Sequence, residues 1–203
     1  MGLTVTDLRN ALTRLQGAMG ELEHTLNAAD AKLGDGDTGT MLARLVDALA
    51  AVDLASETDL GAAFLALAKS GASSTGSSLG TLVVTGLMTA GKATKGRTEV
   101  PWQELGAVII AIRDAAMARG KAALGDKTVI DSLTYLARAI EGSSEAGKVA
   151  EQARAGLAQA LDDFRDRPCG MGRARMFAQK SIGLDDPGML AMARLTGAMT
   201  GDA

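Results

Sequence analysis

The sequence predicts an all-α fold of about eight helices joined by glycine-rich loops. Apolar residues recur at intervals of three and four along most of the 203-residue chain, which is the period of a helix with one buried face. We find no convincing strand pattern. Hydrophobic residues make up 47% of the chain and aromatic residues only 2%. The core must therefore consist of aliphatic and small side chains, which suits closely packed helices.

Four helical segments are expected in the N-terminal half. The first has Thr6 as its N-cap, and the spacing of its apolar residues marks one buried face. That face comprises Leu8, Leu12, Leu15, Met19, Leu22 and Leu26. A second helix begins near Thr38 and reaches Val52, and a third runs from about Thr58 to Lys69. The most apolar segment, Leu79 to Met88, should be buried.

Four more helices are expected in the C-terminal half. Pro101 opens the first of them, as proline commonly does. The next spans residues 129–140, with Asp126 as its candidate cap, and the last two span residues 145–164 and 189–199. Their buried positions again follow the helical period.

The loops after alternate helices share an unusual composition. They are rich in glycine and in polar or charged residues, and they span residues 28–39, 70–80, 120–127 and 167–188. In an antiparallel, up-and-down array of helices, alternate loops lie at the same end. We therefore expect the four loops to converge into a single functional site.

The first of these loops indicates a metal site. It contains Asp30, Asp35 and Asp37, and three carboxylates this close repel one another unless a cation neutralises them. Mg²⁺ favours carboxylates, water and substrate phosphates as ligands. The plain alternative is a surface turn, since Asp and Gly are common in turns. A formal dinucleotide fingerprint over residues 34–39 lacks the preceding strand. An EF-hand is excluded because Lys32 and Met41 occupy ligand positions.

The second loop favours phosphate binding. Residues 70–80 include six Ser or Thr and no charged side chain. Hydroxyl groups and glycine N–H groups can form an anion-binding nest, whereas a flexible linker is the alternative interpretation. The stretch leads directly into the apolar segment that should be buried, which favours an ordered loop. A near match to the P-loop at residues 86–93 fails because Ala93 replaces the Mg²⁺-binding hydroxyl residue.

Composition excludes several other classes of protein. The net charge is −3 and no basic run suggests nucleic acid or an anionic membrane as partner. Every apolar stretch is too short to span a membrane. The single Cys169 fits a reducing compartment, and the N-terminus shows no signal-peptide core. We expect one cytoplasmic domain over residues 1–203, with the lone His24 exposed to solvent.

Four motifs, in order, resemble those of the nucleotide-binding L subunit of dihydroxyacetone kinase (DhaL-type). They are L-G-D-G-D-T-G (33–39), G-A-S-S-T-G-S-S-L-G-T (71–81), G-D-K-T-V-I-D-S-L (125–133), and G-R-A (172–174) followed by K-S-I-G-L-D-D-P-G (180–188). The resemblance covers nearly the whole chain. It implies an eight-helix antiparallel barrel that holds a nucleotide, ADP or ATP, in loops at one end.

The resemblance also implies which residues form the site. Asp30, Asp35 and Asp37 would coordinate a pair of Mg²⁺ ions that bridge the phosphates of the nucleotide. The implied nucleotide contacts are Thr38, Gly39, Thr40, Met41, Ser74, Thr75, Gly76, Gly120, Thr128, Val129, Arg173, Asp186, Pro187 and Gly188. Arginine suits phosphate because its planar fork binds two oxygens at once.

The implied function is phosphoryl transfer to dihydroxyacetone or a related short ketose. The ketose would be held covalently by a histidine of a separate K subunit, and the chain would need that partner for activity. In one subclass ADP is a bound cofactor that a phosphotransferase-system protein rephosphorylates; in the other, ATP exchanges as a substrate. The sequence leaves both open, and a homodimer is compatible with either.

Two positions depart from the usual L-subunit pattern. Thr38 replaces the usual His and Met41 replaces the usual Asn. The D-G-D-T-G-T form resembles the kinase domain of fatty acid kinases instead. The alternatives are therefore a fatty-acid-kinase-like domain with a lipid-binding partner, or an ADP-dependent regulatory subunit that binds a transcription factor.

Overall fold

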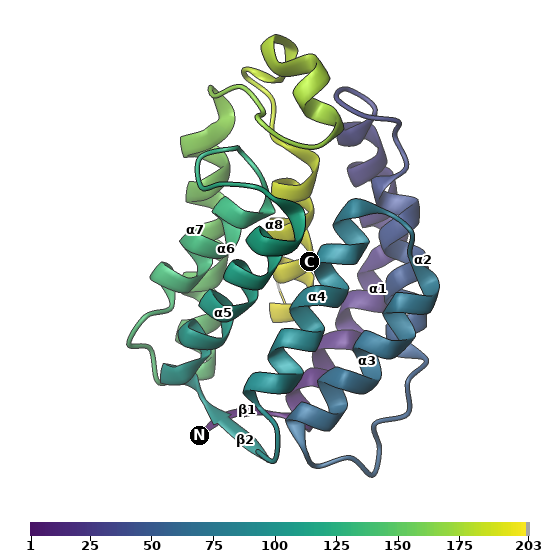
Figure 1. The fold of residues 1–203 in the computed structure, drawn as a ribbon. Coiled ribbons are helices and arrows are strands. Elements are labelled where there is room, and N and C mark those ends of the chain that lie inside the picture. Colours follow the sequence, from purple (N-terminus) through teal and green to yellow (C-terminus); the bar gives the residue numbers. More distant parts are fainter. Residues whose placement is uncertain (202–203) are drawn as a thin grey trace.

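The computed structural model describes residues 1–201, so residues 202 and 203 of the expected domain lie outside the described residues. The described part contains eight α-helices, one 3₁₀ helix and two three-residue strands (Figure 1). The helices are α1 Val5–Asp30, α2 Thr38–Ala50, α3 Leu60–Ser74, α4 Ser78–Ala93, α5 Trp102–Gly120, α6 Val129–Ala139, α7 Ala146–Arg165, η1 Arg173–Ser181 and α8 Pro187–Thr200. The predicted all-α fold is confirmed.

The eight α-helices form a closed ring. Each packs against the next along the chain, and α8 returns to α1. The connections α1–α2, α3–α4, α5–α6 and α7–α8 all lie at the upper end of the molecule in Figure 1. Strands β1, Gly2–Thr4, and β2, Glu99–Pro101, pair antiparallel at the other end. This up-and-down arrangement is what brings the four glycine-rich loops together.

Aliphatic side chains fill the ring, as the composition predicts. The largest buried cluster joins α1, α2, α3 and α8, and Leu26 and Leu60 in it are fully inaccessible to solvent. A second cluster joins α5, α6 and α7 around Ile140 and Leu157. The predicted apolar face of α1 is confirmed, because its members are either buried or packed against the first cluster. His24 is exposed, also as expected.

Several predicted helix boundaries are wrong by one to a few residues, and three of the corrections have a clear local cause. Thr4 rather than Thr6 caps α1, because Thr4 and Asp7 form a reciprocal capping box. Thr128 rather than Asp126 caps α6, again through a capping box, in which Asp131 is the partner. Asp59 caps α3, which therefore begins at residue 60 rather than 58.

The serine- and glycine-rich stretch is mostly helical. Helix α3 continues to Ser74 and α4 begins at Ser78, so only residues 75–77 lie between them. Ser74 supports the last turn of α3 by donating a hydrogen bond to the carbonyl of Ser70. The predicted long loop is in fact a tight corner. The paired strands were not predicted either, because three-residue strands are too short to show a periodic pattern.

A pair of glycine substitutions tests the packing of α3 against α4. A Cβ at Gly61 would lie 2.5 Å from the Lys95 Cα and 2.7 Å from the Gly91 carbonyl oxygen. Because the obstacles are backbone atoms, we expect Gly61→Ala to lower the free energy of unfolding by about 1–3 kcal/mol. Gly17 in α1 has no such neighbour within 4 Å. Gly17→Ala should raise stability by about 0.5–1 kcal/mol. Urea unfolding of both variants measures the difference.

Candidate functional site

A pocket of about 640 Å³ opens at the loop end of the ring. All four glycine-rich regions contribute to its lining, which confirms that they converge. The lining residues are Asp30, Leu33, Asp35, Asp37, Thr38 and Met41; Gly76, Ser77, Ser78, Leu79, Thr81 and Leu82; Arg119, Gly120, Ala122, Thr128, Val129 and Ile130; and Met171, Gly172, Arg173, Ala174, Asp186, Pro187 and Gly188.

Most of the predicted site residues line this pocket, but four do not: Gly39, Thr40, Ser74 and Thr75. The backbone N–H groups of Gly39 and Thr40 donate to Asn27 Oδ1 on α1, at 2.7 and 3.1 Å. Those amides are therefore occupied by protein, and Asn27 acts as the cap of α2. Ser74 and Thr75 use their hydroxyls within the α3–α4 corner.

Several lining residues were missed by the sequence reasoning. Ser77 and Ser78 lie in the predicted Ser-rich motif but were not singled out as contacts. Leu82 and Arg119 lie within helices α4 and α5, where nothing in the local pattern distinguishes a pocket-facing side chain. The described residues show no hydrogen bond or ion pair to the Arg119 side chain, so its guanidinium is available to a ligand. Only the tertiary arrangement reveals these positions.

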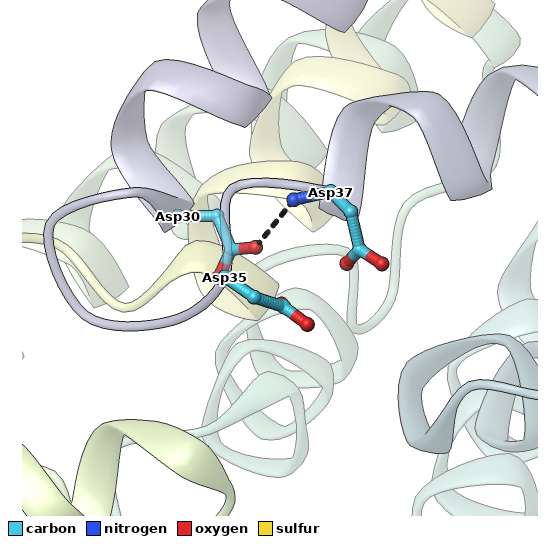
Figure 2. Close-up of side chains that lie close together, drawn as sticks. All are labelled: Asp30, Asp35 and Asp37. Atoms are coloured by element: carbon cyan, nitrogen blue, oxygen red, sulfur yellow. Dashed lines mark hydrogen bonds between the residues drawn. The ribbon is translucent and has the colours of Figure 1, made fainter.

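The acidic loop is organised by its own first carboxylate. Asp30 ends α1 and is 7% exposed. One of its oxygens accepts three backbone hydrogen bonds, from Gly36, Asp37 and Thr38, at 3.0, 3.1 and 3.3 Å; Figure 2 shows the second. Gly36 has φ +78, a conformation that favours glycine. The loop is therefore folded around Asp30.

This folding brings the three carboxylates together. Oxygens of Asp30, Asp35 and Asp37 all lie within 4.8 Å of one another, and the last two side chains are exposed. Some loss of hydration, followed by the neighbouring charge of Asp35, raises the pKa of Asp37. Loss of hydration also acts to raise the pKa of Asp35, but a backbone hydrogen bond and its ion pair with Arg173 outweigh it and lower that pKa. Three hard oxygen ligands at this separation fit Mg²⁺.

The positive ends of four helices face the same pocket. The first residues of α2, α4, α6 and α8 are Thr38, Ser78, Val129 and Pro187, and all four line it. Free N–H groups and the aligned dipole at a helix N-terminus favour anions. At α2 the Thr38, Gly39 and Thr40 amides already donate to Asp30 and Asn27, and at α8 the Met189 amide donates to Asp186. The ends of α4 and α6 are therefore best suited to an anion, and the pocket combines them with a cluster of carboxylates suited to a cation. A metal complex of a phosphate compound has both charges.

Comparison with known proteins identifies the family. The DAK2 domain matches residues 32–201, which is most of the chain. The chain belongs to the DAK2-domain family.

Relatives of this DAK2 domain include free-standing subunits. The ADP-binding subunit DhaL of the PEP-dependent dihydroxyacetone kinase of Escherichia coli is 30% identical over 196 residues, covering 93% of this chain and 92% of that subunit. The corresponding subunit of kinase 1 of Listeria innocua is 30% identical over 180 residues, with 88% and 87% covered. The chain is therefore a DhaL-type DAK2 domain.

A solved structure confirms the fold of the DAK2 domain. The dihydroxyacetone kinase of C. freundii superposes with a TM-score of 0.75 at 21% identity, covering 99% of this chain and 35% of the kinase. Its complex with AMP-PNP and Mg²⁺ gives a TM-score of 0.68 at 21% identity, covering 100% of this chain and 35% of that one. The chain thus spans about a third of that protein. Among the described residues of the DAK2 domain, no helix has the length and apolarity needed to cross a membrane.

The C-terminal wall of the DAK2 pocket contains a carboxyl group with an unusual pKa. Asp186 caps α8 by accepting a hydrogen bond from the Met189 N–H at 2.9 Å. Burial raises the pKa of Asp186 from 3.8 to about 6, although the Met189 and Gly188 amides and the charge of Lys127 act to lower it. Asp186 is therefore partly protonated under mildly acidic conditions.

This pKa predicts a pH effect on stability. A carboxyl group with a raised pKa binds its proton more tightly in the folded state, so its contribution is lost as the pH rises from about 4 to about 6. At about 1.36 kcal/mol per pKa unit, the loss is at most about 3 kcal/mol. Asp186→Asn keeps an N-cap residue and lacks the charge. The free energy of unfolding of the variant minus that of the wild type, measured with urea, should therefore be larger at pH 7 than at pH 4. An equal difference at both pH values would contradict the assignment.

Proposed function

We propose that this DAK2 domain is the ADP- or ATP-binding subunit of a kinase for dihydroxyacetone or a related short ketose. The observation that carries the proposal is the pocket itself, in which a triad of carboxylates lies beside four helix N-termini. That combination suits a nucleotide bound with a divalent cation. The two relatives named for a dihydroxyacetone kinase, and described as its ADP-binding subunit, support it.

The pocket offers different surroundings to the two ends of a nucleotide. Leu79, Leu82, Ala122, Val129 and Met171 supply an apolar wall that suits a base. The phosphates would lie toward the aspartates, where Asp30, Asp35 and Asp37 would hold Mg²⁺, in our proposal two ions. Bound Mg²⁺ neutralises phosphate charge and thereby favours attack on the terminal phosphorus. Arg173 lies at the same end and would contact phosphate once released from Asp35.

The pocket lining supplies position and charge but no histidine that could hold the ketose covalently. Its ionisable side chains are four aspartates and two arginines. The only histidine of the sequence, His24, is exposed on α1. We therefore propose that a separate ketose-binding K subunit holds and activates the acceptor. The chain would then be inactive alone, and the terminal phosphoryl group would pass in line from nucleotide to ketose.

The names of two relatives favour one of the two ways of supplying phosphoryl groups. The relatives matched over 92% and 87% of their length are subunits of PEP-dependent kinases. We propose that ADP stays bound as a cofactor and that a phosphotransferase-system protein rephosphorylates it.

Two experiments test this function. Nucleotide released by acid from the freshly purified protein should be ADP, in about equimolar amount, if ADP is a resident cofactor. The protein combined with Mg²⁺, dihydroxyacetone, the ketose-binding subunit and a PEP-driven phosphoryl donor should form dihydroxyacetone phosphate. Omission of any one component should abolish the product. If ATP in place of the PEP-driven donor gave product at the same rate, ADP would not be a bound cofactor. ATP would instead be a substrate that exchanges in each turnover.

A further inference from the structure

The structure contains a fully buried lysine beside the pocket. Lys127 is 1% exposed, and its backbone has φ +59, in the left-handed region that non-glycine residues seldom adopt. It lies in the α5–α6 loop, immediately before Thr128, which lines the pocket and caps α6. Lys127 itself does not line the pocket. An unusual backbone held in place next to a site is a reason to look for a role.

All three hydrogens of the Lys127 ammonium group are used by one segment of the chain. Nζ donates to the carbonyl oxygens of Arg165, Arg167 and Ser181 at 2.9, 2.7 and 2.8 Å. Arg165 is the last residue of α7 and Ser181 the last of η1. One cation therefore joins the C-terminus of α7 to the C-terminus of η1, the two ends of the segment 165–181. Its position at the C-terminus of α7 also matches the helix dipole.

Backbone hydrogen bonds reinforce this junction. The Gly170 N–H donates to the Asp126 carbonyl and the Gly183 N–H to the Arg165 carbonyl, both at 2.9 Å. The Cys169 N–H donates to Ser181 Oγ at 2.8 Å. Burial lowers the pKa of Lys127, while nearby Cys169, Asp186, Asp185 and Asp166 act to raise it. The contacts to Asp126 and Lys127 hold residues 165–170 and Ser181 beside the N-terminus of α6, and these residues flank the pocket wall formed by residues 171–174.

We propose that Lys127 is a positioning residue for nucleotide binding, which sets the wall formed by residues 171–174 against the wall formed by residues 128–130. Nucleotide affinity then depends on a side chain that never touches the nucleotide. The inference rests on the proposed function, since it concerns the same pocket. The acidic loop is built by hydrogen bonds to Asp30 and Asn27, not to Lys127. It meets the 171–174 wall at Leu33, which packs with Ala174, and at the ion pair of Asp35 with Arg173. Loss of Lys127 should therefore affect nucleotide binding more than metal binding.

Three variants test the role of Lys127. Lys127→Met keeps the length of the side chain without its donors, and Lys127→Ala leaves room for added ethylammonium. The matched control is Lys121→Met, in the same loop, also with positive φ but exposed. Calorimetry measures ADP affinity with Mg²⁺ present. Electron paramagnetic resonance measures Mn²⁺ affinity without nucleotide. The fluorescence of Trp102, at the opposite end of the ring, follows global unfolding.

The proposal predicts a split between the two affinities. Residues that orient the ligands of a metal without touching it are commonly worth about 10- to 100-fold. We expect a residue that orients a nucleotide pocket to act on the same scale, so ADP affinity of Lys127→Met should fall at least about tenfold. Affinity for Mn²⁺ should fall clearly less, because the hydrogen bonds that build the acidic loop around Asp30 and Asn27 remain in place. Ethylammonium should restore ADP binding to Lys127→Ala, and Lys121→Met should match the wild type. Unchanged ADP affinity in folded Lys127→Met, or an equal loss of both affinities, overturns the proposal.

A measurement on the wild type keeps the proposal testable if the variants do not fold. Hydrogen exchange in the absence of nucleotide should show protection at the amides of Cys169, Gly170 and Gly183. Exchange there at the rate of free peptide would disprove the junction. If the wild type did not bind ADP, the proposed function would be disproved. The exchange result would then still report whether the junction at Lys127 is formed.

Discussion

Replacing Asp37 by asparagine should weaken Mg²⁺-dependent ADP binding by about a hundredfold. The substitution keeps the shape of the side chain and its place before α2 but removes one of three charged ligands. Even outer partners of a metal ligand are worth about 10- to 100-fold in metal affinity, so loss of a ligand should lie at the upper end of that range. Titration calorimetry with ADP, at several Mg²⁺ concentrations, measures the change.

A control separates the metal effect from a general charge effect. Asp114→Asn removes one negative charge from an exposed site on α5, where Asp114 pairs with the neighbouring Arg113. It should leave ADP binding and its Mg²⁺ dependence unchanged. In the absence of Mg²⁺, Asp37→Asn should bind ADP no worse than the wild type, because a repelling charge has been removed. A uniform loss with and without Mg²⁺ would show that Asp37 supports the loop rather than the metal.

Asp30→Ala should both destabilise the protein and abolish metal binding. The three backbone N–H groups that donate to Asp30 would lose their acceptor. An unsatisfied buried group costs about 1–3 kcal/mol, and partial hydration should limit the total to about 2–4 kcal/mol. Urea unfolding measures the free energy of unfolding, and titration with Mn²⁺ measures the affinity of the metal site.

Asparagine at the same position distinguishes the two effects. Asp30→Asn retains one oxygen that can accept loop hydrogen bonds, so it should lose clearly less stability than the alanine variant. It should still lose metal affinity, because its charge is gone. Asp114→Ala, on the surface, should change stability by no more than about 0.5 kcal/mol. If Asp30→Ala were as stable as wild type, the loop would not depend on this carboxylate.

The local features of this chain were predictable from its sequence. The apolar face of α1 repeats regularly enough to specify a helix and its buried side. The aspartates of the acidic loop are close along the chain, so their grouping in space follows from a few residues of backbone. The glycine-rich loops follow alternate helices. Their convergence could be predicted because alternate loops lie at the same end of an antiparallel, up-and-down array.

The features that were missed depend on contacts between distant segments. Asn27 lies in the last turns of α1, and nothing nearby indicates that it would cap α2. From the sequence, Lys127 would be expected to be an exposed loop residue. In the structure, carbonyl groups of α7, of η1 and of the segment between them surround it. The end of α3 was misplaced because Ser and Gly disfavour a helix locally, whereas packing against α2 and α4 stabilises it. Tertiary contacts overrode local preference in each case.

The most direct test of the account is a calorimetric titration of the nucleotide-free protein with ADP, in the presence and absence of Mg²⁺. We predict saturable binding of one ADP per chain, at least about tenfold tighter with Mg²⁺ in view of the three carboxylates at the site. Binding that is equally tight without Mg²⁺ would contradict the assignment of the aspartates. Absence of binding under both conditions would contradict the nucleotide site itself.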